Sequence, residues 1–285
     1  MSWMTEYKSS LKSYDVEEIL DLYFFRPLSF LFVKLIYPTN ITPNQISVFS
    51  MLFGILAGVM FGFGQPFFLI MAGVALLVSN VLDCADGQLA RLKKNGTGIG
   101  RIIDGFIDYI TGFSIFAGIG IGMSLLSDNY LYIWVITVAG GFSRVIQNML
   151  FDYYRNVYLK YVYGRGSDIA KEIDEYSRMK VILDKQKRRY GEKFLVNIYI
   201  KYSKFQMNST KEEALNVTPE EYKAKNKFML RLWSWLGSTT HLAAVIFACY
   251  TNRIEYYLWI TFALGNVLML IFYLIQKKII KGYTV

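Results

Sequence analysis

The chain has 285 residues, of which 54% are hydrophobic and 17% aromatic, and its formal net charge is +9. So apolar a composition excludes an ordinary soluble domain of this size, argues against a nucleic-acid partner, and is typical of a polytopic membrane protein. Cys84 and Cys249 fall in different predicted spans, so the sequence implies no disulfide framework.

The N-terminal segment, residues 1–43, precedes the first predicted span. Met1–Tyr14 is polar and mixed in charge, and it shows no cleavable signal peptide. Val16–Tyr37 is apolar, but Pro27 interrupts it, which makes it a poor candidate for a span. We predict an amphipathic helix that lies in the cytoplasmic membrane interface, with a short hydrophobic hairpin as the alternative.

A helix start follows at Thr42-Pro43-Asn44. Proline is favoured in the first helical turn, and Thr42 or Asn44 can cap the helix. The unpaired N–H groups of such a start attract a phosphate or the polar edge of a base. We therefore expect this helix start to face the functional site.

Six stretches each come near the ~20 residues that a membrane-crossing helix needs. They are Asn44–Gly64, Pro66–Leu82, Ile102–Leu126, Tyr130–Leu150, Leu232–Tyr250 and Tyr256–Ile275. Short cytoplasmic loops collect Lys and Arg. Here these residues gather in the N-terminal region, in the loop after the second span and in the C-terminal tail, whereas the opposite loops hold only Arg253. We predict a six-helix bundle with both termini in the cytoplasm, in the inner or plasma membrane if the protein is bacterial.

The most specific pattern lies between Asp83 and Asp108. It is D-x-x-D-G-x-x-A-R, then eight residues, then G-x-x-x-D-x-x-x-D. The specified residues of each half recur at three- and four-residue intervals, so each set shares one face of a helix. If the two helices face each other, four carboxylates meet, and protons or cations must neutralise their repulsion.

Oxygen ligands in this number suit Mg²⁺, Mn²⁺ or Ca²⁺, and no Cys or His set for zinc is nearby. Two such ions can hold a pyrophosphate and stabilise the attacking and leaving oxygens of a displacement at phosphorus. A divalent-metal site for phosphoryl transfer is therefore the first hypothesis. The alternative is a buried polar cluster that joins the helices without metal, and the cost of four acids in a bilayer argues against it.

Polar residues also interrupt the later spans. The fourth span carries Arg144, Asn148, Asp152 and Arg155 at near-helical intervals. Ionisable groups at membrane depth usually face a cavity or a partner, so Arg144 either serves the site or pairs with a carboxylate of the bundle. Arg155 lies nearer the interface and either serves the site or reaches the lipid headgroups. His241, in the fifth span, either lines an acceptor pocket or packs between helices.

A polar, basic segment, residues 158–228, separates the fourth and fifth spans. Its alternating charges predict helices. This insert is either solvated in the cytoplasm or forms a basic lid for anionic lipid headgroups or a phosphorylated substrate. The chain thus divides into residues 1–43, residues 44–157 with the first four spans, the insert, and residues 229–285 with the last two spans and the tail.

The aspartate pattern resembles the signature of the CDP-alcohol phosphotransferases, the class I CDP-alcohol phosphatidyltransferase family. It matches at Asp83, Asp86, Gly87, Ala90, Arg91, Gly100, Asp104 and Asp108. The resemblance extends to the Pro43-Asn44 helix start and the six-helix plan but not to the insert, since many members have a short loop there. It implies an integral membrane enzyme, commonly a homodimer, with two divalent cations, Mg²⁺ or Mn²⁺. Such an enzyme transfers a substituted phosphate from a CDP-linked donor to an alcohol and releases CMP.

The resemblance also implies roles for individual residues. Asp83, Asp86 and Asp104 would be metal ligands, and Asp108 would be both a shared ligand and the general base for the acceptor hydroxyl. Contacts to the nucleotide or its phosphates would come from Asn44, Ser47, Gly87, Ala90, Arg91 and Thr97. Arg144, Arg155 and His241 are the candidates for binding the acceptor.

Several functions fit this resemblance. We expect CDP-diacylglycerol as donor and inositol, inositol phosphate or a similar alcohol as acceptor, in phospholipid biosynthesis, because Arg144, Arg155 and the basic insert suit an anionic partner. The first alternative is a soluble donor, CDP-inositol, CDP-choline or CDP-ethanolamine, with a lipid or inositol-phosphate hydroxyl as acceptor. The second alternative is a membrane scaffold that binds metal without turnover.

Overall fold

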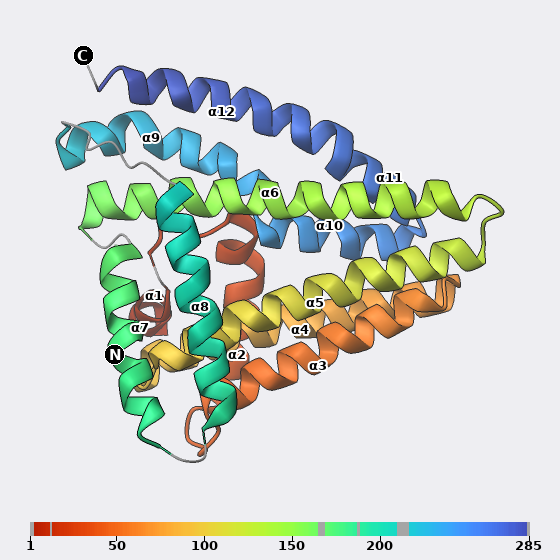
Figure 1. The fold of residues 1–285 in the computed structure, drawn as a ribbon. Helices are drawn as coiled ribbons and strands as arrows, with labels where there is room; N and C mark the ends of the chain where they lie inside the picture. The colour runs from red at the N-terminus through yellow and green to blue at the C-terminus, as the bar shows by residue number, and fades with distance from the viewer. Residues whose placement is uncertain (1–2, 12, 165–168, 187–188, 210–216, 284–285) are drawn as a thin grey trace.

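Helices make up almost all of the computed structural model, which describes residues 3–11, 13–164, 169–186, 189–209 and 217–283 (Figure 1). No strand occurs among these residues, which confirms the all-α prediction. The first half holds α1 (Trp3–Ser10), the π-helix η1 (Asp21–Phe25), α2 (Arg26–Ile36), α3 (Pro43–Gly62), α4 (Pro66–Lys93), α5 (Gly98–Leu125) and α6 (Tyr130–Tyr163). The second half holds α7 (Ile169–Asp184), α8 (Tyr190–Ser209), α9 (Pro219–Trp233), the 3₁₀ turn η2 (Ser234–Leu236), α10 (Ser238–Thr251), α11 (Ile254–Trp259), the π-helix η3 (Ile260–Gly265) and α12 (Asn266–Lys281).

Six helical segments are long and apolar enough to cross a membrane. They are Pro43–Gly62, Pro66–Lys93, Gly98–Leu125, Tyr130–Tyr163, Pro219–Thr251 and Ile254–Lys281. Each overlaps one of the predicted stretches, and the chain is an integral membrane protein. Several helices run beyond their apolar stretch: α4 continues past Leu82 to Lys93, and α6 continues to Tyr163. The aspartates therefore lie on the same continuous helices as the spans.

The long helices form two groups that share one core. α3, α4 and α5 run side by side, and α6 lies with α9 to α12 against them (Figure 1). The largest buried cluster joins both groups, with Phe61 from α3, Leu76 from α4, Ile119 from α5, Val245 from α10 and Leu258 from α11. The position of α4 and α5, and with it the position of the aspartates, is thus fixed by packing on several sides.

The segment before the first span packs along α4. Val33 and Ile36 of α2 lie in one buried cluster with Ala85 and Leu89 of α4. Leu35, on the other face of α2, is exposed. A helix that combines a packed face with an exposed apolar face suits the predicted membrane interface.

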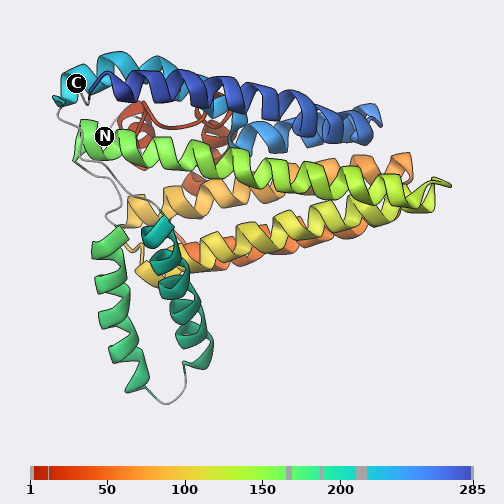
Figure 2. The same ribbon diagram turned by 45° about the horizontal axis from the view of Figure 1, so that its top comes forward.

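The insert folds as a helical hairpin of α7 and α8. Figure 2 shows the hairpin projecting from the bundle across the direction of the spans. It packs on the start of α5 through a buried cluster of Ile102, Tyr176, Leu183, Val196 and Ile200. The rest of the insert includes residues 165–168, 187–188 and 210–216, which lie outside the described part of the chain.

α3 and α5 approach each other closely because glycines line their contact. A Cβ atom at Gly54 would lie 2.7 Å from the Thr111 hydroxyl oxygen, and one at Gly118 would collide with the backbone carbonyl of Gly58. Small residues at such contacts are typical of membrane helices, where van der Waals packing drives association. These glycines hold α5, the carrier of Asp104 and Asp108, against α3.

Gly118→Ala should destabilise the bundle, because its new methyl group meets backbone that cannot move aside. Overpacking of this kind costs about 1–3 kcal/mol, and we expect a lower thermal unfolding midpoint in detergent. Gly112→Ala, on the same helix, is the matched control, since a Cβ atom there meets no atom within 4 Å. Equal midpoints for the two variants would contradict the role given to the α3–α5 contact.

Candidate metal centre

A tight reversal between α4 and α5 brings the two halves of the aspartate pattern together. α4 ends at Lys93, and the next residue, Lys94, adopts a left-handed conformation with φ 52°. α5 starts at Gly98, and the side chain of the preceding Thr97 accepts a hydrogen bond from the Gly100 N–H at 3.0 Å. Thr97 therefore caps the helix, as threonine often does. This short turn places the last turns of α4 beside the first turns of α5.

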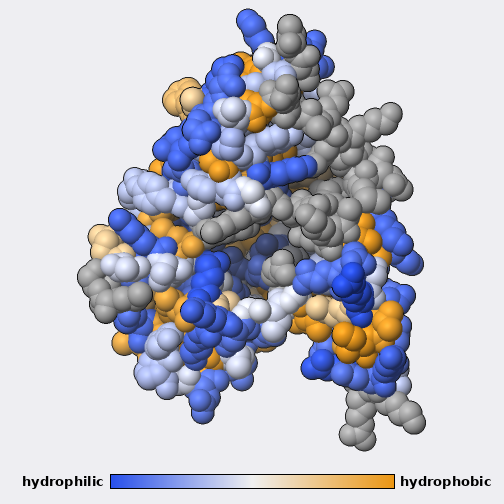
Figure 3. Space-filling model, turned by 90° about the vertical axis from the view of Figure 1, so that its left-hand side faces the viewer, coloured by the Kyte–Doolittle hydropathy of each residue, from blue (hydrophilic) through white to orange (hydrophobic). Residues whose placement is uncertain are grey.

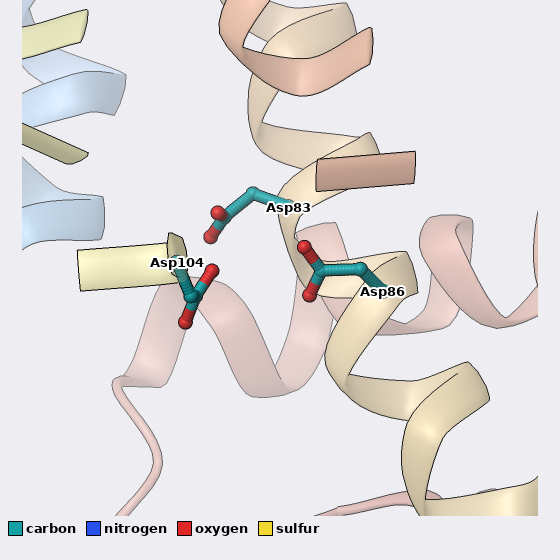
Figure 4. Close-up of side chains that lie close together, drawn as sticks. All are labelled: Asp83, Asp86 and Asp104. Atoms are coloured by element: carbon teal, nitrogen blue, oxygen red, sulfur yellow. The ribbon is translucent and has the colours of Figure 1, made fainter. Parts of the chain in front are cut away.

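Three of the four aspartates form one compact group. Asp83, Asp86 and Asp104 each offer a carboxylate oxygen, and these oxygens lie within 4.8 Å of one another (Figure 4). Asp86 is buried and the other two are partly buried. Asp108, one turn further along α5, is more exposed, and its carboxylate interacts electrostatically with those of Asp83 and Asp104. Three of the four acids thus converge as predicted, and Asp108 interacts with two of them without joining the compact group.

The donor set of this group fits a hard divalent cation. Three carboxylates at this spacing repel one another unless positive charge lies between them. All three donors are oxygens, the ligands that Mg²⁺ and Mn²⁺ prefer. The neighbouring Cys84 thiol instead donates to Asp21 at 3.7 Å. Asp83, Asp86 and Asp104 are therefore the residues that could hold metal, and the predicted share of Asp108 in this site stays a prediction.

The start of α3 borders the aspartates, as the sequence predicted for a helix start. Thr42 and Gln45 form a reciprocal capping box there. The Ser47 hydroxyl donates a hydrogen bond to the Asp86 carboxylate. The Asn44 side chain lies beside Gly100, because a Cβ atom on that glycine would come 3.0 Å from the Asn44 Oδ1 atom. Ser47 thus orients a metal-ligand candidate, and Asn44 stands at the α4–α5 turn.

The remaining predicted nucleotide contacts lie on the last turns of α4. A Cβ atom at Gly87 would lie 3.2 Å from the Arg91 guanidinium, so glycine leaves room for that side chain. The Nε atom of Arg91 donates to the backbone carbonyl of Ser10 in α1. Ala90 is partly buried, next to the loop residue Gly96. Arg91 therefore joins α4 to the N-terminal segment, and its predicted contact with nucleotide stays a prediction.

One of the three predicted acceptor residues, Arg144, interacts with Asp108, and a second, His241, interacts with Arg144. Arg144 interacts electrostatically with Asp108 and with His241, and its guanidinium lies 5.9 Å from the centre of the Phe116 ring. His241 is buried, and its Nε2 atom has no hydrogen-bond partner among the described residues. Arg155 instead pairs with Asp152 at 2.8 Å. Of the three, Arg144 is thus the one placed beside the predicted base.

The sequence reasoning missed a second acidic cluster, which the N-terminal segment buries against the site. Asp21 interacts with Asp83, while Arg26 pairs with Glu17 at 2.8 Å and with Asp21 at 3.8 Å. The Glu18 carboxylate accepts hydrogen bonds from the Thr239 and Thr240 backbone N–H groups, at 3.1 and 3.2 Å, at the start of α10. The sequence does contain a signal for this cluster, because residues 17–21 read E-E-I-L-D and place three acids inside an apolar stretch.

Burial controls the charge of this cluster. Loss of solvent raises the pKa of Glu18 to about 8, and the negative charge of Asp21 adds to the effect, whereas the two backbone N–H groups oppose it. Burial likewise raises the pKa of Asp21. Asp15 behaves in the opposite way: Tyr163, Lys227 and Lys223 outweigh its burial and lower its pKa to about 2. The segment thus contains acids with raised pKa values and one with a lowered pKa.

The site lies at a hydrophilic end of the bundle. Figure 3 looks onto the end at which α6 finishes and α9 begins, and hydrophilic side chains cover much of it. The α4–α5 turn, with its exposed residues Lys94 and Asn95, lies towards the same end. The aspartates, on the last turns of α4 and the first turns of α5, therefore lie towards this hydrophilic end.

Comparison with known proteins agrees with this geometry. Residues 40–165 match the family model described as CDP-alcohol phosphatidyltransferase, and this range includes all four aspartates. The archaetidylinositol phosphate synthase of Pyrococcus horikoshii is 35% identical over 89 residues, which are 31% of this chain and 46% of that protein. The chain therefore matches less than half the length of this curated relative.

Ser47→Ala should weaken metal binding about tenfold, because residues that orient a metal ligand typically contribute 10–100-fold to affinity. Mn²⁺ titration of the purified protein, followed by electron paramagnetic resonance, measures the effect. Ser50→Ala is the matched control, since the Ser50 hydroxyl donates to the Ser79 carbonyl at 2.8 Å and not to an aspartate. An unchanged Mn²⁺ affinity in Ser47→Ala would rule out this role for the Ser47–Asp86 hydrogen bond.

Glu18→Gln should reduce the pH dependence of stability. The pKa of Glu18 rises from 4.5 to about 8 on folding, so between these values the folded protein holds a proton that the unfolded chain has lost. Stability is therefore lost as pH rises through this window. We expect the unfolding midpoint of wild type to fall from pH 5 to pH 8 more steeply than that of Glu18→Gln. Glu220→Gln, at an exposed position, should keep the wild-type slope; the same slope in Glu18→Gln would refute the proposed titration.

Proposed function

We propose that the chain is a membrane phosphotransferase of phospholipid synthesis, because residues 40–165 match the family model described as CDP-alcohol phosphatidyltransferase. It transfers a substituted phosphate from a CDP-linked donor to an alcohol and releases CMP. The observation that carries the proposal is the convergence of Asp83, Asp86 and Asp104 at one end of the bundle, with Asp108 one turn away.

In the proposed site, Asp83, Asp86 and Asp104 would hold the divalent cations, Mg²⁺ or Mn²⁺, and Asp108 would be a further ligand. Such cations would supply positive charge for the pyrophosphate of the donor and for the leaving oxygen. Asn44, Ser47 and the small residues Gly87 and Ala90 leave the donor room beside α3 and α4. The protein thus supplies position and charge, which dominate catalysis of phosphoryl transfer.

Asp108 acts as the general base in this proposal. It accepts the proton of the acceptor hydroxyl while the alcohol oxygen attacks the phosphorus that carries the transferred group. The bond from that phosphorus to the bridging oxygen of the pyrophosphate breaks, and CMP departs with the bridging oxygen. The greater exposure of Asp108 relative to Asp86 supports this division, since a less enclosed carboxylate can meet an incoming alcohol.

We further propose CDP-diacylglycerol as donor and an inositol phosphate as acceptor. The relative from Pyrococcus horikoshii is named for an inositol phosphate lipid, and Arg144 supplies a positive charge near Asp108 for an anionic acceptor. His241, which interacts with Arg144, completes this side of the site. The alternative is a soluble donor such as CDP-inositol with a lipid or inositol-phosphate hydroxyl as acceptor.

The distribution of Lys and Arg supports a cytoplasmic location for the site and for both termini. CDP-linked donors and Mg²⁺ are available on that side. A homodimer is also part of the proposal, on the strength of the family resemblance alone. A scaffold that binds metal without turnover remains the competing function.

Asp108→Asn should lower CMP release at least about 100-fold, because loss of a general base typically removes a factor of 10²–10⁴. The assay incubates purified protein in lipid with Mg²⁺ or Mn²⁺ and follows CMP. CDP-diacylglycerol, CDP-inositol, CDP-choline and CDP-ethanolamine are offered in turn, each with inositol, inositol phosphate and a lipid alcohol. We expect the highest rate from CDP-diacylglycerol with inositol phosphate.

Asp128→Asn is the control for this assay, because Asp128 is an exposed acid between α5 and α6, at the other end of α5 from the site. It should release CMP at the wild-type rate. Wild-type protein that binds Mn²⁺ but releases no CMP from any donor would favour the scaffold. Equal rates in wild type and Asp108→Asn would refute the role given to this residue.

A further inference from the structure

The proposed function leaves the α7–α8 hairpin without a role. The hairpin is fixed at its base, since the Tyr176 hydroxyl donates to the Gly98 carbonyl at 3.3 Å and Val196 and Ile200 are buried in the cluster on α5. Near its tip, the Lys193 ammonium donates to the Asp184 carbonyl at 3.4 Å and ties α8 to α7. The hairpin is therefore a built element with a defined position relative to the start of α5.

One side of α8 exposes a row of large apolar side chains. Tyr190, Phe194 and Ile198 follow one another at four-residue intervals and are 76%, 62% and 42% exposed. Residues at this spacing share a helix face. Two residues correspond to a rotation of about 200°, so Phe194 and Ile198 point away from the buried Val196. The row therefore lies on the side of α8 that faces away from α7.

Basic side chains accompany this row. Lys201 and Lys204 are exposed; at about 100° per residue, Lys201 falls within the row, and Lys204 lies at its border. Arg189 precedes Tyr190 and is 52% exposed. The acidic residue of this helix, Glu192, lies outside the row and pairs with Arg189 at 3.2 Å. The exposed face of α8 is thus apolar with a positive border.

The direction of α8 matches a membrane surface. Figures 1 and 2 show α8 running across the direction of the spans, next to the start of α5, with α7 on the side away from the spans. The face of α8 opposite α7 is therefore turned towards the region that the lipid around the spans occupies. Apolar side chains with a basic border are typical of helices that lie in the headgroup layer.

We propose that the exposed face of α8 binds the surface of an anionic membrane. Tyr190, Phe194 and Ile198 enter the boundary between headgroups and acyl chains, and Arg189, Lys201 and Lys204 contact anionic headgroups. The hairpin then ties the start of α5, and with it the helix of Asp104 and Asp108, to the lipid surface. This inference concerns lipid contact alone and does not depend on the proposed reaction.

The test places a fluorescent thiol label at Phe194→Cys in the full-length protein, with Val181→Cys as the matched control. Val181 is also apolar and is 56% exposed, but it stands two residues from the buried Leu183 and so faces away from α8. Cys84 and Cys249 are buried, so the label goes to the introduced thiol. Each protein is placed in nanodiscs of phosphatidylcholine, with or without phosphatidylglycerol, and brominated lipids quench the label.

We expect brominated lipid to quench the Phe194→Cys label at least about twofold more strongly than the Val181→Cys label in discs with phosphatidylglycerol, since the apolar face enters the acyl boundary. Adding Lys201→Gln and Lys204→Gln to the Phe194→Cys protein should weaken the binding of this face to the membrane about fivefold for each lysine. This loss should occur only in discs that contain phosphatidylglycerol. Equal quenching at the two positions overturns the proposal. Efficient crosslinking between Phe194→Cys copies without quenching also overturns it and assigns the face to a second copy of the chain.

Discussion

The mutual repulsion of the aspartates on α4 and α5 is the constraint on which the rest of the site depends. Asp83, Asp86 and Asp104 place oxygens within 4.8 Å of one another on helices that also cross the membrane. Asp86 is buried and the other two carboxylates are partly buried, so the charges interact strongly. The fold holds them together through rigid helices, a short α4–α5 turn and the glycine contact with α3. Such an arrangement needs protons or cations to neutralise it, and its oxygen donors suit the divalent cations of the proposed reaction.

The N-terminal segment adds a second layer of charge around this site. Its acids do not join the metal-ligand group, because Arg26 and the start of α10 already engage them. Glu18 therefore connects the segment to the second group of helices, and Arg91 connects it to α4 through Ser10. The segment acts as a packed wall of the site and not only as an interfacial helix. Residues of α1, α4 and α10 that are far apart in the sequence are thereby held in one structure.

The insert shows how an added element can be attached without disturbing the bundle. α6 ends at Tyr163 and α9 begins at Pro219, so the spans on both sides remain continuous helices. The hairpin between them touches the bundle mainly at the start of α5. In the described part of the chain, the exposed apolar face of the hairpin does not contact the bundle. The lipid that surrounds the spans is the apolar environment nearest to this face.

The sequence by itself determined the helical class, the apolar stretches and the shared helix face of the aspartates, because hydrophobic content and three- or four-residue spacing are local properties. It also predicted a site for divalent metal, since the ligand chemistry of four acids follows from residue type. Only the tertiary structure decided that Ser47 orients Asp86, that Arg91 reaches Ser10 and that Glu18 meets the start of α10. These partners are 39, 81 and 221 residues apart. Periodicity shows which face of a helix is polar, whereas the packing of the helices decides which residues that face contacts.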